Sequence, residues 1–468
     1  MIHRHVWPDP APVCLLCCRS LMRRFFQQER WWVAIYIAAV LSPLALVLIT
    51  PSPPSRGFLV EFAMGLGFVG LAMLGLQFAL TARFRSIGGR LGLDTMLQFH
   101  RQAGIIAALF VFGHVVVALA SEPAYFVFLD PRDNFARAGA LSLVIVLIPL
   151  LLVLTFYRER IGLPYEWWRL SHGIIGALIL VIGLAHVIRV DYLIGTPAKR
   201  AVIGVLVVGA IALLIHTRLV RPWLARRRPW RVADVRRETP RIWTLTLQSD
   251  SEHGLRFLPG QCVWLTIDES PFSFQQHPFT ISSTAAESIQ SPPVRTFEVT
   301  IKELGDFTRQ IGKVKPGSRA FVEGPYGTSV MDPEAKSPAV FIVGGIGVTP
   351  AICMLRTLRD LQRQRPLLLL YATRTVDGAA FENELACMKN EMDLNVVRLV
   401  EEPPDGWTGE SGRFSAEILE RVVKPPFDRD DTQYFICGPD SMMDLAELTL
   451  RDRGVSAVQI HSERFQIV

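Results

Sequence analysis

The sequence predicts a multi-domain protein that begins with a bundle of six transmembrane helices. An antiparallel β-barrel domain and then an α/β domain with a parallel sheet follow the bundle. Three observations predict this order. Half of the 468 residues are hydrophobic, and the long apolar stretches all lie before residue 220. Short alternating runs separated by turns come next, and solid apolar runs separated by helical segments come last.

Six apolar stretches are long enough to cross about 30 Å of hydrocarbon. They cover residues 31–50, 57–80, 100–120, 139–156, 170–190 and 200–220, and the fourth is short with uncertain ends. We therefore expect a transmembrane domain over residues 31–220, preceded by a cytoplasmic segment of residues 1–30 that lacks the apolar core of a signal peptide. Cys14, Cys17 and Cys18 cluster in that segment, and we interpret them as reduced thiols rather than acylation or metal sites.

Basic residues predict the orientation of the bundle. They are concentrated around the second-to-third and fourth-to-fifth connections and after the sixth span, at Arg83, Arg85, Arg90, Arg101, Arg158, Arg160, Arg169, Arg218, Arg221, Arg226, Arg227, Arg228 and Arg231. The positive-inside rule places these connections and the whole region after residue 220 in the cytoplasm, so we expect a multi-pass protein of the plasma membrane. The net charge of +6 then reflects topology, since no nucleic-acid-binding motif accompanies it.

Four histidines lie at matched spacing in two of the spans. His100 and His114 are fourteen residues apart, and so are His172 and His186. Fourteen residues make nearly four helical turns and rise about 21 Å, so each helix presents its two histidines on one face. Because the third and fifth spans cross the membrane in the same direction, His100 should pair with His172 near the inner side. His114 should then pair with His186 toward the outer side.

A neutral imidazole is a good axial ligand for haem iron, and ionisable groups at membrane depth are costly and usually functional. The matched spacing therefore predicts two b-type haems, each held by one histidine pair. The alternative is four separate histidines bonded to neighbouring backbone or water. Arg101 and Arg169 are candidate partners of inner haem propionates and Arg189 of the outer haem, or all three lie at the membrane interface.

The region after the bundle divides into two soluble domains. Alternating runs at 241–247, 262–267, 297–302 and 320–323 predict a small antiparallel barrel over residues 229–335. Solid apolar runs at 339–343, 367–372, 395–400 and 433–437 predict a parallel sheet over residues 336–468.

Two motifs in the barrel region have the composition of a cofactor site. The first contains His277, Pro278, Phe279, Thr280 and Ser282, and the second contains Lys302, Gly305, Phe307 and Thr308. A planar ring needs a flat apolar wall, and a diphosphate needs uncrowded backbone amides. Together the motifs resemble the flavin site of the ferredoxin–NADP reductase superfamily. The resemblance implies bound FAD, with the Thr280 hydroxyl near N5 of the isoalloxazine and the Gly305–Thr308 turn at the pyrophosphate.

The last domain has a glycine-rich turn between a strand and a helix, formed by Gly344, Gly345, Gly347, Thr349 and Pro350. Such a turn lets the backbone approach a pyrophosphate at a helix N-terminus. The turn is similar to the nicotinamide-nucleotide site of the same superfamily, and the resemblance extends to three further places. Cys437, Gly438 and Pro439 match its turn beside the nicotinamide, Arg374 lies where the ribose is selected, and Phe465 matches the terminal aromatic that covers the flavin. Arg374 suits a 2′-phosphate and favours NADPH, with NADH as the alternative.

With the histidine pairs included, the chain resembles the ferric reductase/NADPH oxidase family over about residues 30–468, in its prokaryotic form. The resemblance implies an enzyme that passes electrons from cytoplasmic NAD(P)H through FAD and two haems to dioxygen or ferric iron on the opposite side. Ala118 stands where eukaryotic oxidases carry a further histidine, which puts an oxidase-type oxygen pocket in doubt. Reduction of quinone or of a partner redox protein, and a haem-binding sensor with a vestigial reductase half, are the alternatives. Beyond the small-molecule acceptor and membrane lipid, no obligatory protein partner is expected.

Overall fold

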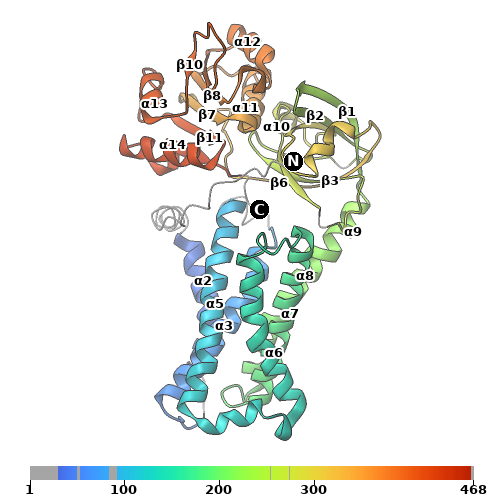
Figure 1. Cartoon of the computed structure of the whole chain (residues 1–468), viewed down its shortest axis with the longest axis vertical. Coiled ribbons are helices and arrows are strands. Elements are labelled where there is room, and N and C mark those ends of the chain that lie inside the picture. The colour runs from blue at the N-terminus through green and yellow to red at the C-terminus, as the bar shows by residue number, and fades with distance from the viewer. Residues whose placement is uncertain (1–29, 50–52, 84–91, 253, 274, 465–468) are drawn as a thin grey trace, which may run out of the picture.

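The computed structural model describes residues 30–49, 53–83, 92–252, 254–273 and 275–464. Six helices in this part of the chain are long and apolar enough to cross a membrane, as predicted. They lie side by side in Figure 1, with the soluble half at one end of the bundle. Their bounds are α2 (Arg30–Ile49), α3 (Phe58–Leu80), α5 (Leu93–Ser121), α6 (Pro131–Phe156), α7 (Tyr165–Val190) and α8 (Pro197–Ile215).

The third and fourth spans begin earlier than the hydropathy pattern predicts. Helix α6 has 26 residues, so the expectation of a short fourth span is wrong. Its start is set by Asp130, whose side chain accepts a hydrogen bond from the Arg132 amide, and by Pro131 in the first turn. The first turns of α5 and α6 are polar, and a search for apolar residues therefore misses them.

Helix α3 lies at the centre of the bundle and packs against α2, α5, α7 and α8. A larger share of its residues is buried inside the protein than in the other five spans. The other five helices expose more apolar side chains, as expected for surfaces that face lipid. A short 3-10 helix, η1 (Pro123–Leu129), joins α5 to α6 at the end of the bundle away from the soluble half.

The barrel domain is connected to the bundle by η2 (His216–Val220) and α9 (Arg221–Arg226). Its six strands are β1 (Trp230–Thr239), β2 (Ile242–Ser249), β3 (Cys262–Ile267), β4 (His277–Thr280), β5 (Thr296–Lys302) and β6 (Arg319–Tyr326). They are ordered β4-β3-β6-β1-β2-β5, and every pairing between neighbours is antiparallel. A bridge between Ile281 and Val299 joins the two ends of this order, which closes the sheet into a barrel.

The last domain is a parallel sheet covered by helices. Its strands are β7 (Ala339–Gly344), β8 (Leu367–Thr373), β9 (Leu394–Val400), β10 (Glu410–Ser411), β11 (Gln433–Cys437) and β12 (Ile460–Ser462), in the order β10-β9-β8-β7-β11-β12. The main helices are α11 (Val348–Asp360), α12 (Glu382–Glu391), α13 (Ala416–Val422) and α14 (Asp440–Asp452). Strands β7, β8 and β11 all end at one edge of the sheet, where ligands bind in folds of this kind.

Candidate functional site

The structure brings the four membrane histidines together in the pairs that the sequence predicts. The ring centroids of His100 and His172 are 6.1 Å apart, and those of His114 and His186 are 6.3 Å apart. A metal–imidazole bond of about 2 Å places the centroids of two axial rings about 6 Å apart. Both pairs therefore have the separation of imidazoles that lie on opposite sides of one metal ion.

The outer pair is oriented by the backbone of α3. His114 Nδ1 lies 2.8 Å from the Ala63 carbonyl oxygen and donates to it in the tautomer that leaves Nε2 free for a metal. Gly67 leaves room for this ring, because a Cβ at that position would lie only 3.0 Å from His114 Nδ1. In the inner pair, the Nδ1 atom of His172 lies 3.4 Å from the Thr155 hydroxyl oxygen on α6.

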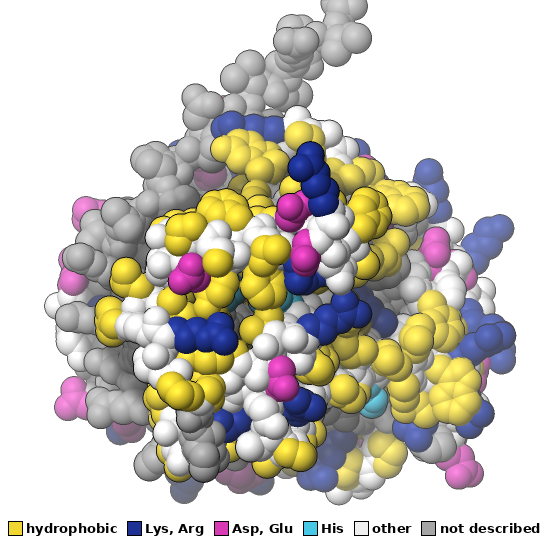
Figure 2. All heavy atoms as spheres, turned by 90° about the horizontal axis from the view of Figure 1, so that it is seen from below, with side chains coloured by type: hydrophobic (Ala, Val, Ile, Leu, Met, Phe, Trp, Pro, Cys, Tyr) yellow, Lys and Arg dark blue, Asp and Glu magenta, His cyan; other side chains and the backbone are white. Residues whose placement is uncertain are grey.

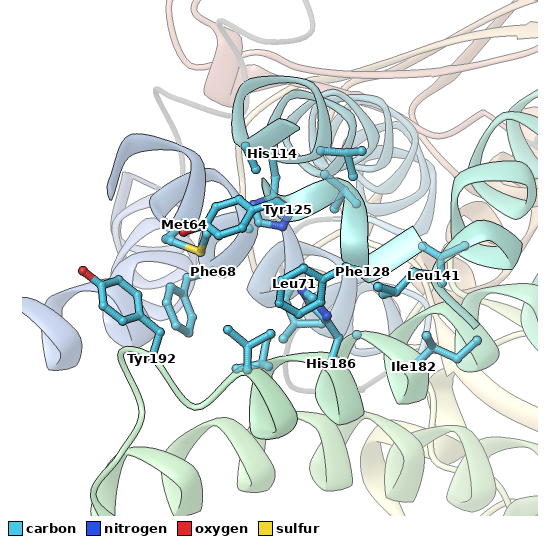
Figure 3. Close-up of a pocket in the computed structure, with 18 of the residues that line it drawn as sticks. Met64, Phe68, Leu71, His114, Tyr125, Phe128, Leu141, Ile182, His186 and Tyr192 are labelled. Atoms are coloured by element: carbon cyan, nitrogen blue, oxygen red, sulfur yellow. The ribbon is translucent and has the colours of Figure 1, made fainter. Parts of the chain in front are cut away.

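A cavity of about 1400 Å³, including its open mouth, surrounds His114 and His186. Figure 3 shows both rings projecting into it, with Met64, Phe68 and Leu71 of α3 along one side. Its other walls come from α5, η1, α6, α7 and the segment after α7, and they are almost entirely apolar. An apolar cavity with two facing imidazoles fits a b-type haem. The described residues contain no cluster of three or more His, Cys, Asp or Glu that would suit a bare metal ion.

The mouth of this cavity contains a cation that the sequence analysis did not select. Arg56 lines the cavity and donates a hydrogen bond of 3.2 Å to the Tyr125 hydroxyl. Its guanidinium lies 4.0 Å from the ring centroid of Tyr192, whose hydroxyl donates to Glu61 at 2.7 Å. Figure 2 looks onto this end of the molecule and shows basic side chains among hydrophobic ones around the middle of the face.

The expected arginine partners are placed differently. Arg189 is exposed and does not line the described cavity, whereas Arg56 does. Arg137 is also near, with its guanidinium 4.7 Å from the ring centroid of Phe128, which contacts His186. Arg101 is exposed and lies over the Phe156 ring at 5.4 Å. Arg56 could not be selected from the sequence, because it precedes α3 in a stretch rich in proline and serine and belongs to no motif.

The predicted flavin-binding residues converge on strand β4 and the turn before η3 (Thr308–Lys313). The rings of His277 and Phe307 are stacked at 4.3 Å, and Phe279 lies nearly parallel to Phe307 at 6.2 Å. Residues from two separate motifs thus build one flat apolar wall, as the isoalloxazine of FAD requires. Thr280 ends β4 and is buried, and Ser282 beyond it accepts a hydrogen bond from Thr300.

The turn expected at the pyrophosphate is stabilised by hydrogen bonds between its own residues. The Thr308 hydroxyl accepts hydrogen bonds from the amides of Leu304 and Gly305, each at 2.8 Å. Space beside Gly305 is open, since nothing lies within 4 Å of an added Cβ. Lys302 projects from the end of β5 toward the glycine-rich turn, with Nζ 3.8 Å from the Cβ position of Gly345. Burial and the nearby Arg241 lower the pKa of Lys302.

The two predicted nucleotide turns pack directly on each other. A Cβ at Gly347 would lie 2.2 Å from the Cys437 carbonyl oxygen, and one at Gly344 would lie 2.7 Å from Cδ of Pro439. Only glycine lets β7 and β11 end this close together. Thr349 is buried and donates to the Ile346 carbonyl at 3.0 Å, which fixes the first turn of α11, where Pro350 is also buried. Gly438 completes the contact, because its Cβ position is 2.9 Å from the Gly344 nitrogen.

Arg374 lies just beyond β8 and is largely exposed. Its guanidinium forms an ion pair of 2.9 Å with Glu402, which is also exposed. The preceding residue, Glu401, directly follows β9 and pairs with Arg413 at 2.6 Å. Exposed pairs of this kind contribute little energy, so a phosphate dianion can compete with Glu402 for Arg374.

A carboxylate that was not selected from the sequence lies beside the predicted nicotinamide turn. Glu463 is buried, and its carboxylate oxygens lie 3.0 and 3.1 Å from the Cβ position of Gly327. Burial raises the pKa of the Cys437 thiol to about 12, and Glu463 adds to the rise. The thiol is therefore neutral at physiological pH. Phe465, the expected flavin cover, lies outside the described residues.

The flavin strand faces the end of the bundle that carries the inner histidines. Burial lowers the pKa of His277, and among its charged neighbours are Glu166 and Arg169 in the first turns of α7. On the same helix, the ring centroids of Trp168 and His172 are 5.3 Å apart. The structure thus places the predicted flavin wall next to the segment that leads to the inner pair.

One carboxylate connects the two halves at this junction. Glu323 on β6 pairs with Arg221 at 3.2 Å and with Arg83 at 3.4 Å, and it accepts from the Tyr326 hydroxyl at 2.7 Å. Arg83 follows α3, has a left-handed φ of 48°, and lies 3.7 Å from the Trp264 ring centroid. Burial alone would raise the pKa of Glu323, but Arg83, Tyr326 and Arg221 lower it overall.

Comparison with known proteins adds three family matches in the order of the observed domains. The ferric reductase like transmembrane component matches residues 66–183, an FAD-binding domain matches 233–330, and an oxidoreductase NAD-binding domain matches 341–447. Together the three matches are those of a ferric reductase/NADPH oxidase-type flavocytochrome with a ferredoxin–NADP reductase-like part. The chain is a multi-pass membrane oxidoreductase with FAD-binding and NAD(P)H-binding domains.

Curated relatives of this ferric reductase-type chain match about half of it. An NADPH oxidoreductase of Mycobacterium tuberculosis is 26% identical over 52% of this chain and 62% of its own length. Ferredoxin–NADP reductase B of Sorangium cellulosum is 26% identical over 50% of this chain and 96% of its own length. Among solved structures, a ferredoxin reductase in carbazole 1,9a-dioxygenase is 25% identical, covers 51% of this chain and 69% of its own, and has a TM-score of 0.44.

Proposed function

We propose that this protein carries electrons from cytoplasmic NAD(P)H across the plasma membrane to an acceptor on the opposite side. One observation carries the proposal: two histidine pairs lie at two levels of the bundle, at 6.1 and 6.3 Å, and the inner pair lies next to the flavin wall. The pairs are separated along α5 and α7 by a rise of about 21 Å. They therefore mark a route along most of the membrane thickness.

In this proposal the membrane histidines would bind two haems. His100 and His172 would hold the inner haem, and His114 and His186 would hold the outer haem. Haem at each pair would supply one-electron redox chemistry. The contact from His114 to the Ala63 carbonyl fixes the ring orientation, and the apolar walls of the cavity exclude water from the outer pair.

The soluble residues bind and orient the two-electron donor. We assign residues 229–335 to the flavin domain and 336–468 to the nucleotide domain, after a transmembrane domain over 31–220. His277, Pro278, Phe279 and Phe307 would face the flavin ring, with Thr280 near its reacting edge. FAD bound there would supply the chemistry that converts two-electron donation by NAD(P)H into one-electron transfer. The turn from Gly344 to Pro350 would hold the nucleotide pyrophosphate, and Cys437, Gly438 and Pro439 would lie beside the nicotinamide.

The basic residues at the two ends of the bundle indicate its orientation in the membrane and the kind of acceptor that it reduces. The end of the bundle near the barrel carries Arg83, Arg169 and Arg221, which the positive-inside rule places in the cytoplasm. The outer mouth then opens to the far side, where an acceptor is reduced at the haem edge. Dioxygen and ferric chelates both suit such a site. Ala118 lines the cavity in place of a further polar ligand, and Arg56 offers a positive charge to an anionic chelate.

The proposal is tested by measuring turnover separately with each electron acceptor. The purified protein with FAD and haem should oxidise NADPH steadily, and the rate is compared with dioxygen, ferric citrate and a quinone, with and without superoxide dismutase. Arg56→Gln should raise the KM for anionic ferric citrate and leave dioxygen reduction little changed. An absence of steady NADPH oxidation with every acceptor would contradict the proposal and favour a sensor with a vestigial reductase half.

A further inference from the structure

Helix α11 physically links the two proposed cofactor sites of the soluble half. It begins at Val348, inside the glycine-rich nucleotide turn, and ends at Asp360. Arg356 lies six residues beyond Pro350, a rise of about 9 Å along the helix. Its side chain leaves the nucleotide domain and reaches the barrel, where it is 11% exposed.

On the barrel side, Arg356 holds the chain that follows the flavin strand. Its Nη1 atom donates to the Ser282 carbonyl at 2.8 Å and to Glu298 Oε2 at 2.9 Å. Ser282 is two residues beyond Thr280, and its amide donates to the Glu298 carbonyl at 2.8 Å. The guanidinium therefore binds the Ser282 backbone and the Glu298 side chain, which lie on two adjacent segments at the end of β4, rather than a remote part of the barrel.

On the nucleotide side, Arg356 is held by a second carboxylate. Nε and Nη2 donate to the two oxygens of Glu384 on α12, each at 2.7 Å. This bidentate geometry is specific to arginine, and its planar fork fixes direction as well as distance. One side chain thus connects a helix of the nucleotide domain with the strand that carries Thr280.

The same helix face makes further contacts with the barrel. The Thr357 hydroxyl accepts from the Ala285 amide at 2.9 Å, and Cys353 is buried in the core cluster of the barrel. These contacts hold the domains together without Arg356. Arg356 is therefore not needed merely to hold the two domains together. Its contact with Ser282 instead links the end of β4 to the helix that begins at the nucleotide turn.

We propose that Arg356 is a positioning residue for hydride transfer, because it fixes the flavin strand relative to the nicotinamide site through Ser282, Glu298 and Glu384. The inference rests on the proposed flavin and nucleotide sites. Hydride transfer depends steeply on the distance and angle between the two rings, and a misplacement of about 1 Å costs up to about a hundredfold in rate. Loss of the guanidinium should accordingly slow the chemical step more than it weakens either cofactor.

The test compares Arg356→Gln and Arg356→Lys with Arg359→Gln in the full-length holoprotein. Arg359 is a matched control, since it lies on the same helix and approaches the same Glu384 at 3.8 Å. Its other ion-pair partners, Asp360 and Glu391, also belong to the nucleotide domain. Anaerobic stopped-flow absorbance measures flavin reduction by NADPH and the flavin–nicotinamide charge-transfer band. FAD content and NADP⁺ affinity are measured separately.

We expect Arg356→Gln to keep its FAD and bind NADP⁺ within about threefold of the wild type, with flavin reduction slowed about tenfold or more and a weakened charge-transfer band. Arg356→Lys should recover part of the rate, and Arg359→Gln should match the wild type. An unchanged rate and band in Arg356→Gln would overturn the inference. So would a loss in which FAD content and NADP⁺ affinity fall in parallel with the rate and lysine gives no recovery. If the wild type itself showed no flavin reduction, both the proposed function and the inference would fail.

Discussion

The membrane half and the reductase half build their candidate sites in opposite ways. In the membrane half, four single side chains on α5 and α7 face each other in pairs, and each pair depends on both members. In the reductase half, the candidate site is spread over turns at the ends of several strands, where glycines such as Gly347 let backbone segments meet. A single substitution should therefore abolish cofactor binding at a histidine pair. A single substitution in the reductase half should only reduce binding or activity in part.

The largest effect is expected when one of the two histidine pairs in the membrane is broken. His114→Ala should remove the outer haem and leave the inner haem at His100 and His172, because an axial ligand on one side cannot be replaced from the apolar walls. Haem content per chain, measured by the pyridine haemochrome assay, should fall from two to one. Haem content should stay at two in His216→Ala, which removes an exposed histidine from the same half. Two haems with an unchanged six-coordinate spectrum in His114→Ala would contradict the assignment.

The next effect concerns nucleotide choice. Arg374→Ala should raise the KM for NADPH by roughly ten- to a hundredfold, which corresponds to a charge-assisted contact of about 1.5–3 kcal/mol. The KM for NADH should change far less, because NADH has no 2′-phosphate. Glu402→Gln should have the opposite sign and lower the KM for NADPH modestly, since it releases Arg374 from its ion pair. Equal effects of Arg374→Ala on both nucleotides would show that Arg374 does not contact the phosphate.

A smaller effect is expected at the flavin wall. Thr280→Val keeps the shape of the buried side chain and removes a hydroxyl that we place near the flavin N5. Flavin reduction or the onward transfer of electrons should slow by about tenfold, while the haem spectrum stays that of the wild type. Stopped-flow absorbance at flavin and haem wavelengths separates the two steps. A change in the haem spectrum would instead indicate that the substitution disturbs the bundle.

The smallest effect is expected at the junction between the membrane half and the reductase half. Glu323→Gln removes the charge that pairs with Arg83 and Arg221, and partly exposed pairs contribute about 0.2–1 kcal/mol each. Reduction of haem by NADPH should slow a few-fold while flavin reduction keeps its rate. The wild type should show the same selective slowing as pH falls through the lowered pKa of Glu323, because protonation removes the same charge.

Glu334→Gln is the control for this variant, since Glu334, at the end of the flavin domain, forms an exposed pair with Arg363 of the nucleotide domain. Equal slowing in both variants would show that the junction pair has no special role in transfer between the halves.

Much of the membrane half could be predicted because helical periodicity alone places residues fourteen apart on one face. The pairing of His100 with His172 and of His114 with His186 followed from spacing and direction, without knowledge of packing. Arg56 could not be found in this way. It lies outside every apolar span, and only the fold brings it to the mouth of the cavity, with Tyr125 and Tyr192.

In the reductase half, motifs identified the turns but not the contacts between them. The stacking of His277 on Phe307 joins two motifs that are separated by a whole strand. The family resemblance identified both motifs, but it did not show that these two rings are in contact. Arg356 belongs to no recognised motif, because its role depends on a domain interface. Strand β1, with five basic or acidic residues among its ten, is not among the alternating runs selected from the sequence and forms a strand by pairing with β2.

Vectorial electron transfer is the central claim and can be measured in sealed, right-side-out vesicles that contain the full-length protein. An impermeant ferric acceptor is added outside, and NADPH is supplied on one side at a time. The account predicts that the outside acceptor is reduced only when NADPH is inside, and that His114→Ala abolishes this reduction while flavin reduction continues. Reduction of the outside acceptor by NADPH added outside the intact vesicles would contradict the proposed orientation and the transmembrane route.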